Sequence, residues 1–310
     1  TGCDYTTLQA AHDAASDGDV IDGQGETFTA VLSITTAGID FQNFTINAAG
    51  LNAHGIITTV QADFSNVTVT GANENGGTYY DGIQVRGTSG TTLTNCSSTN
   101  NAGRGLVMWA TGTGQGGLTV TGGNFNGNGE AGILVTGNVV GTKLSNISIS
   151  NVTASSNIGA GIYILKCDTV TLSNNTTNLN GDASNGNEDY GIAINCSDNV
   201  TASSNTMTGT INGAGFAIYG DTSDADCGTA STLLFSKNII NGTSSGKSCI
   251  EHLAVGDAAV PSAIYRSNIV ANCGRRGFEL YKSGAGSPSQ VTLYNNTISE
   301  TAESGLANLG

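Results

Sequence analysis

The chain has 310 residues, with 45 Gly and only 2 Pro, and charged residues make up 11% of it, against roughly 25% in an average soluble domain. Its 10 Lys and Arg residues against 24 Asp and Glu residues give a net charge of -14, which argues against a nucleic-acid partner because phosphates would be repelled. No apolar run is long enough for a membrane-spanning helix, and no Gly-X-Y period indicates collagen. The composition predicts a large, β-rich, acidic and extracellular protein.

The N-terminal segment differs from the rest of the chain. A helix is predicted over 7–15, because Leu8, Ala11 and Ala15 fall on one of its faces. A turn then leads into a strand at 20–21. A repeat protein needs a cap where its first repeat would otherwise expose the core, so we expect this helix to cover one end of the fold.

A short motif then recurs along the chain: Gly, a large apolar residue, any residue, and usually a second apolar residue. It begins at Gly55, Gly82, Gly105, Gly132, Gly161, Gly191, Gly215, Gly277 and Gly305, with Cys249 in the place of the Gly between the seventh and eighth copies. The repeat length is about 28 residues. Alternating stretches such as TTLTN and TVTLSNN lie between the copies and predict short strands.

A period of this length, with about three strands per repeat and no helix, predicts an all-β fold: a single parallel β-helix solenoid of about ten to eleven rungs, each rung being one turn of the coil. The Asn residues that end the alternating stretches are expected to close the turns, since Asn tolerates the left-handed conformation, and to hydrogen-bond to their copies one rung away. We assign 1–45 to the cap and first rung, and 46–310 to the β-helix, within one structural domain.

The segments YTTLQAA (5–11) and ASDGDVI (15–21), followed by GI-x-V and N-N-T rungs, resemble right-handed β-helix proteins of the pectin-lyase-like superfamily. The resemblance covers essentially the whole chain and implies a right-handed coil. Members of that superfamily include pectate and alginate lyases, polygalacturonases, alginate epimerases, phage tailspikes and surface adhesins. The resemblance is therefore specific for the fold and weak for the function.

The seven Cys residues have no C-x-x-C spacing, which argues against zinc binding and thioredoxin-like chemistry. They are Cys3, Cys96, Cys167, Cys196, Cys227, Cys249 and Cys273. Since the number is odd, at least one thiol has no partner within the chain. Disulfides of a secreted protein and small buried side chains both remain open, and the sequence does not give the pairing.

In each rung the residues after the Gly are expected to alternate between inward and outward positions. Outward aromatic residues are candidates for stacking on sugar rings, and Arg275, Arg276, Glu279 and Lys282 form the densest charged site in the chain. The candidate carbohydrate-binding residues are Trp109, Tyr163, Tyr219, Glu279 and Tyr281. The alternatives are an ordinary salt-bridged turn and an outward apolar row that lies under a loop or a neighbouring chain.

The candidate catalytic residues are Asp81, Arg86, Lys166 and Asp189, since a lyase or a hydrolase needs an acid or base together with a group that neutralises or protonates the substrate. The sharper catalytic motifs of polygalacturonases, alginate epimerases and classical pectate lyases do not occur in this sequence. Asp221, Asp224 and Asp226 form a candidate Ca²⁺ site, with a solvated acidic loop as the alternative.

Asn-x-Ser/Thr triplets are candidate glycosylation sites at Asn43, Asn66, Asn146 and Asn241, although turn Asn followed by Thr generates such triplets without any glycan. We expect a secreted or cell-surface protein that binds or cleaves extracellular polysaccharide. The alternative is a non-catalytic adhesin, sheath or filament subunit. The chain stops within a rung, so we expect either that the polypeptide continues into a neighbouring domain or that another subunit covers the open C-terminal end by self-association.

Overall fold

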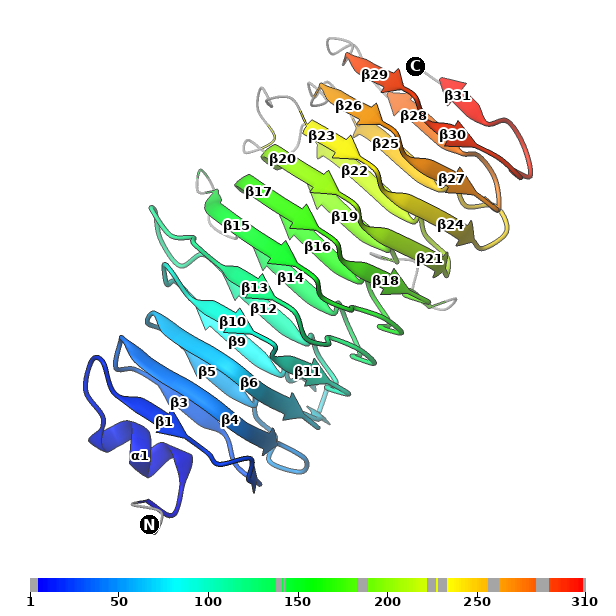
Figure 1. Cartoon of the computed structure of the whole chain (residues 1–310). Coiled ribbons are helices and arrows are strands. Elements are labelled where there is room, and N and C mark those ends of the chain that lie inside the picture. The colour runs from blue at the N-terminus through cyan, green and yellow to red at the C-terminus, as the bar shows by residue number, and fades with distance from the viewer. Residues whose placement is uncertain are drawn as a thin grey trace.

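Parallel strands stacked rung upon rung make up most of the molecule (Figure 1). The computed structural model describes residues 5–137, 141, 143–182, 189–221, 227, 233–255, 262–282 and 290–308. Within these ranges there is one α-helix, α1 (Leu8–Ala14), which is followed by strands to residue 308.

Three parallel sheets run along the coil. The 13-stranded sheet contains β1 (Val20–Asp22), β2 (Thr27–Phe28), β4 (Ile39–Asn47), β6 (Ala62–Thr70), β10 (Thr92–Thr94), β11 (Ser97–Thr99), β13 (Thr119–Thr121), β15 (Leu144–Ser150), β17 (Cys167–Ser173), β20 (Asp198–Ser203), β23 (Leu233–Ser236), β26 (Ala263–Arg266) and β29 (Val291–Tyr294). The 11-stranded sheet contains β3 (Leu32–Ile34), β5 (Ile56–Thr58), β9 (Ile83–Arg86), β12 (Leu106–Trp109), β14 (Ile133–Thr136), β16 (Ile162–Leu165), β19 (Ile192–Asn195), β22 (Phe216–Asp221), β25 (Ile250–Val255), β28 (Phe278–Lys282) and β31 (Leu306–Asn308). The five-stranded sheet contains β18 (Thr176–Asn178), β21 (Thr206–Thr210), β24 (Ile239–Thr243), β27 (Ile269–Ala271) and β30 (Thr297–Ile298), while β7 (Glu74–Asn75) and β8 (Thr78–Tyr79) form a separate antiparallel pair.

Each strand of the 11-stranded sheet pairs in parallel with the strand one rung before and one rung after it. Leu106 of β12, for example, is in register with Ile83 of β9 and with Ile133 of β14. The eleven strands of this sheet confirm the predicted solenoid of about ten to eleven rungs. Because the registers continue from rung to rung, each position of the Gly motif becomes a straight row of side chains along the coil.

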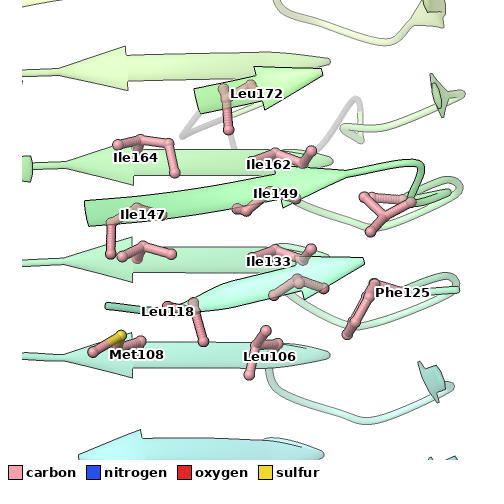
Figure 2. Close-up of a cluster of buried hydrophobic side chains, with 14 of the residues drawn as sticks. Leu106, Met108, Leu118, Phe125, Ile133, Ile147, Ile149, Ile162, Ile164 and Leu172 are labelled. Atoms are coloured by element: carbon pink, nitrogen blue, oxygen red, sulfur yellow. The ribbon is translucent and has the colours of Figure 1, made fainter. Parts of the chain in front are cut away.

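The core lies between the sheets, and inward side chains from successive rungs stack upon one another (Figure 2). Ile133 and Ile162 from the 11-stranded sheet, and Ile147 and Ile149 from the 13-stranded sheet, are essentially inaccessible to solvent. Burial of each such side chain contributes roughly 1.5–3 kcal/mol. The stacked apolar rows therefore hold the coil together.

Helix α1 covers the N-terminal end of this core, as predicted. Its N-cap is Thr7, whose hydroxyl accepts a hydrogen bond from the backbone N–H of Ala10. Leu8 is buried in the core, and Ala11 and Ala15 pack against it. The helix therefore presents the predicted apolar face to the first rungs.

Two ladders of Asn side chains line the turns, and all of their members are buried except the partly buried Asn296. One contains Asn101, Asn128, Asn157 and Asn180, and the other contains Asn175, Asn205, Asn238, Asn268 and Asn296. Asn128, for example, donates from Nδ2 to Oδ1 of Asn157 at 3.0 Å, and its own Oδ1 accepts from Asn101. The residue before a ladder Asn often has a positive φ, as Asn100 and Asn174 do. Both predicted roles of Asn are thus confirmed. In the ladders, the ladder Asn bonds to its copy one rung away, and the residue before it adopts the left-handed conformation that closes the turn.

The Cys residues divide into bonded and free ones. The structure pairs Cys196 with Cys227 and Cys249 with Cys273, whereas Cys96 and Cys167 are buried free thiols. Burial raises the pKa of Cys96 to about 11 and that of Cys167 still further, so both thiols are protonated and unreactive at neutral pH. Cys3 lies outside the described residues.

Candidate functional site: two polar clusters on one sheet

The outer face of the 11-stranded sheet carries two straight rows of side chains. The first outward row is Ser33, Ile57, Gln84, Val107, Leu134, Tyr163, Ala193, Ala217, Glu251, Glu279 and Ala307. The second outward row is Arg86, Trp109, Thr136, Leu165, Asn195, Tyr219, Leu253 and Tyr281. Neighbouring members of a row are about 4.8 Å apart, the spacing of strands in a sheet.

The middle of this face is apolar and covered. Val107 and Ala217 are inaccessible to solvent, and Tyr163 is 7% exposed; they form a second apolar cluster outside the coil. Trp109 and Tyr219 pack against its edge and stay partly exposed. The expectation that the outward apolar row is covered therefore holds within the single chain, and little of the Tyr163 ring is open to a ligand. The Tyr163 hydroxyl accepts a hydrogen bond from Nδ2 of Asn195 at 3.1 Å.

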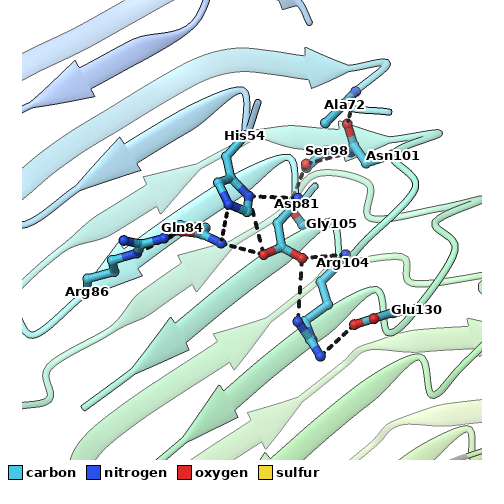
Figure 3. A network of polar contacts seen from close by, with 10 residues as sticks. All are labelled: His54, Ala72, Asp81, Gln84, Arg86, Ser98, Asn101, Arg104, Gly105 and Glu130. Carbon is cyan, nitrogen blue, oxygen red and sulfur yellow. Dashed lines mark hydrogen bonds and ion pairs between the residues drawn. The ribbon is translucent and has the colours of Figure 1, made fainter. Parts of the chain in front are cut away.

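The His54 cluster lies toward the N-terminal end of this face and comprises His54, Asp81, Gln84, Arg86, Arg104 and Glu130 (Figure 3). Asp81 is 1% exposed. Its Oδ1 accepts from the backbone N–H of Arg104 at 2.7 Å, and its Oδ2 accepts from Nε2 of Gln84 at 2.6 Å. The Oε1 of Gln84 in turn accepts from Nε of Arg86 at 2.8 Å. Of the candidate catalytic residues, Asp81 and Arg86 are thus joined through Gln84.

His54 is neutral in this cluster. The backbone N–H of Asp81 donates to its Nδ1 at 2.9 Å, and its Nε2 lies 3.1 Å from Nε2 of Gln84. Burial lowers the pKa of His54, the charge of Asp81 opposes this, and the charges of Arg86 and Arg104 lower it further. Burial also raises the pKa of Glu130, against the attraction of Arg104, with which it forms an ion pair.

The Glu279 cluster lies toward the C-terminal end of the same face and comprises Tyr219, Ser248, Glu251, Arg275, Arg276, Glu279 and Glu303. Glu279 is 7% exposed. It accepts hydrogen bonds from Arg276 at 2.8 Å, from Arg275 at 3.1 Å and from Ser248 at 2.6 Å. The densest charged site of the sequence is therefore a closed network around one carboxylate.

Glu251 is the neighbour of Glu279 in the first outward row. Burial raises the pKa of Glu251, and the adjacent Glu279 raises it further, against weaker attraction from Lys247 and Arg275. The Tyr219 hydroxyl lies 3.5 Å from Oε2 of Glu251, and burial raises the pKa of that phenol far above its ordinary value. Glu251 therefore lies where its charged form is disfavoured, whereas Glu279 accepts hydrogen bonds from two arginines.

Other candidate residues lie apart from these clusters. Lys166 follows β16 with a φ of 54°. Asp189 is 2% exposed, its Oδ2 accepts from Asn212 at 3.0 Å, and burial raises its pKa. Asp221 ends β22, while Asp224 and Asp226 lie outside the described residues. Within the described ranges, no three His, Cys, Asp or Glu side chains are grouped to hold a metal ion.

Three of the candidate glycosylation sites adopt the turn conformation expected of Asn. Asn43, Asn66 and Asn146 have φ near +55°, and Nδ2 of Asn66 donates to Oδ1 of Asn43 one rung away at 3.1 Å. Asn241 is exposed and accepts from Asn272. The turn geometry accounts for Asn at the first three sites, and glycosylation stays a prediction.

Sequence reasoning missed the partners of Asp81, and a signal for them was present. His54, Asp81 and Arg104 each stand immediately before the Gly of three successive motifs, and Glu130 stands two residues before the Gly of the next. Alignment of the repeats on this Gly would have placed all four at one corner of neighbouring rungs. The same position is occupied by Ser248 and Arg276 in later rungs.

The family comparison agrees with this architecture. The sequence model described as "Right handed beta helix region" matches residues 26–176 and 113–310. The chain therefore belongs to the right-handed β-helix family. No curated protein sequence is significantly similar to it.

Solved structures with the same fold include enzymes and an adhesin. The A-module of the Azotobacter vinelandii mannuronan C-5 epimerase AlgE6 is 15% identical, with 97% of this chain and 91% of that one covered and a TM-score of 0.60. Pectate lyase Pel9A is 15% identical, with 94% and 72% covered and a TM-score of 0.61. PfbA, a surface adhesin of Streptococcus pneumoniae, is 13% identical, with 96% and 87% covered and a TM-score of 0.58. At these identities the likeness establishes the fold alone.

Proposed function

We propose that this protein binds an extracellular polysaccharide along the second outward row of the 11-stranded sheet. The observation that carries the proposal is the straight row that places Arg86, Trp109, Asn195, Tyr219 and Tyr281, all partly or fully exposed, on one face of the sheet, with Thr136, Leu165 and Leu253 between them. The polar and aromatic side chains form two adjacent pairs, Arg86 with Trp109 and Asn195 with Tyr219, whose members are about 4.8 Å apart, along a line that an extended chain of sugar units can follow. Aromatic faces bury the C–H groups of sugars, and polar neighbours bond their hydroxyls.

The fold and composition support the same proposal. Two of the similar structures are named for action on mannuronan and pectate, and a third is a surface adhesin. The two disulfides and the acidic composition suit an oxidising compartment outside the cytoplasm. The described residues contain no helix long and apolar enough to cross a membrane.

A second candidate function is adhesion without catalysis. The observation that favours it is that Asp81 and Glu279 are buried and engaged by the chain's own donors. An acid that must meet a substrate needs an open oxygen. Assays of turnover on every polymer that the protein binds separate the two functions.

Polysaccharide binding is tested by affinity electrophoresis in gels that contain alginate, polygalacturonate or a neutral glucan. Each gel is run with Ca²⁺ and with a chelator, because Ca²⁺ remains a proposed cofactor. Replacing Trp109 or Tyr281 by Ala should weaken binding about tenfold each, equivalent to about 1.4 kcal/mol. The matched control is Tyr294→Ala, since Tyr294 is 61% exposed on β29 of the 13-stranded sheet. Failure of the unaltered protein to bind any polymer, or an equal loss in the control, would overturn the proposal.

A further inference from the structure

Arg86 differs from the other arginines of the two clusters. Arg104, Arg275 and Arg276 each form an ion pair with a carboxylate. Among the residues that the structure describes, no carboxylate lies within ion-pair distance of Arg86. Its positive charge is therefore not neutralised by a direct partner, although the side chain is partly buried.

The orientation of Arg86 is nevertheless fixed. Its Nε donates to Oε1 of Gln84 at 2.8 Å, and one terminal nitrogen, Nη2, donates to the same oxygen. The guanidinium carbon lies 5.4 Å from the centre of the Trp109 ring, a cation–π contact. The N–H groups of Nη1 make no hydrogen bond within the described part of the chain. One side of the guanidinium is thus held and the other is available.

Gln84 can accept hydrogen bonds from Arg86 only through the oxygen of its amide, because the nitrogen of that amide is a donor. Asp81 accepts from Nε2 of Gln84 at 2.6 Å, which turns Oε1 toward Arg86. Asp81 is itself engaged by the backbone N–H of Arg104. The buried carboxylate therefore orients the arginine through the amide and does not cancel its charge by contact.

We propose that Arg86 binds an anionic group of the polysaccharide, a carboxylate or a sulfate ester, and that Gln84, oriented by Asp81, is its positioning residue. The inference rests on the proposed function because it concerns the same outward row. A guanidinium binds either group through parallel N–H donors. Trp109 lies on the next strand, where a sugar ring attached to that group would meet the indole.

Trp109 is the only Trp in the chain, so its fluorescence reports on this site alone. Glucuronic acid and glucose 6-sulfate, titrated separately, should each change the emission saturably if both groups bind, and one alone if Arg86 discriminates between them. Glucose should have no such effect. Arg86→Gln should lower the affinity for the anions at least tenfold. The matched control Arg266→Gln, at an exposed Arg of β26 on the 13-stranded sheet, should leave it unchanged.

The positioning role has its own test. Gln84→Glu places a carboxylate against Arg86 and should abolish the preference for anionic over neutral sugars. Gln84→Leu leaves the positive charge of Arg86 but removes the hydrogen bonds that fix its guanidinium, and should reduce the preference about fivefold. A role confined to stability would move the melting temperature and leave this ratio unchanged.

The outcomes separate this inference from the proposed function. If polymers bind with no preference for anionic ones, or if Arg86→Gln keeps the preference, the assignment of Arg86 is overturned while polysaccharide binding stands. If small anions change the Trp109 emission but no polymer binds, the anion site stands and the proposed function fails. If neither anion changes the emission, the anion site is overturned.

Discussion

The His54 cluster and the Glu279 cluster occupy the same rows of the coil, toward opposite ends of one sheet face. In both, the residue immediately before the motif Gly or Cys contributes a polar side chain: His54, Asp81 and Arg104 in the first, Ser248 and Arg276 in the second. Between them the same position is filled by Ala131, Ala160, Tyr190 and Ala214; the three Ala are buried in the outer apolar cluster, and Tyr190 packs against it. The coil repeats a geometry, and the side chains placed in it decide whether a rung is polar or apolar.

The two clusters have opposite electrostatic outcomes. In the His54 cluster the buried carboxylate of Asp81 is engaged by Arg104 and Gln84, and Arg86 has no acidic partner among the described residues. In the Glu279 cluster two arginines converge on Glu279, and no cation of the described part of the chain is in ion-pair contact with Glu251. One end of the face therefore presents a cation and the other an acid whose pKa is raised. A ligand that spans both ends would meet different chemistry at each.

The largest effect is expected when the acid of the His54 cluster is removed. Asp81→Ala leaves the backbone N–H of Arg104 and the Gln84 amide without their acceptor in a buried site, and leaves the Arg104 guanidinium with Glu130 as its remaining partner. A loss of roughly 3–5 kcal/mol is expected for breaking such a buried contact. Thermal unfolding followed by circular dichroism measures it. Asp40→Ala, at an exposed residue of β4, is the control and should stay within about 0.5 kcal/mol of the unaltered protein.

A smaller loss is expected from Glu279→Ala, although Glu279 accepts three side-chain donors. The reason is that Arg275 is 35% exposed and both arginines keep Glu303 as a partner. We expect about 2 kcal/mol, since solvent screens the released charges. Removal of the exposed Glu303 by Glu303→Ala serves as the comparison and should cost less than about 1 kcal/mol. A Glu279→Ala loss equal to that of Asp81→Ala would contradict the distinction drawn between the clusters.

The sequence was sufficient to predict the rows but not the contacts between them. The motif Gly residues placed Trp109 and Tyr219 in one outward row, because a fixed repeat on a parallel coil makes the register regular. The same alternation of inward and outward positions predicts that His252 points into the coil. In the structure its Nδ1 lies 3.1 Å from the Tyr265 hydroxyl. Regularity of the backbone was the only information that these predictions needed.

The roles within the clusters depend on partners that the repeat does not specify. Asp81 appeared as a candidate acid because it precedes a motif Gly, but its burial arises from Arg104 and Gln84 in neighbouring positions. Tyr163 appeared as a sugar platform, but its exposure is decided by what packs outside the coil. Cysteine pairing was equally beyond reach, because it depends on which turns meet in space.

The smallest expected effect on stability is the pH dependence that arises from Glu251, the acid of the Glu279 cluster whose pKa is raised. Glu251 faces Glu279 on β28 and Tyr219 on β22, with Lys247 and Arg275 as the nearby cations, and its pKa is raised from its ordinary value of 4.5, by burial first and by Glu279 second. A carboxyl whose pKa is higher in the folded state contributes stability that is complete below pH 4.5 and is lost as the pH rises through the folded pKa. Melting temperatures of the unaltered protein and of Glu251→Gln should therefore diverge above pH 4.5, with the variant becoming relatively more stable toward neutral pH. Glu26→Gln, at an exposed site, is the control, and its melting temperature should change with pH in the same way as that of the unaltered protein. Parallel curves for Glu251→Gln as well would mean that the pKa of Glu251 is not raised in the fold, and that burial and Glu279 do not disfavour its charge.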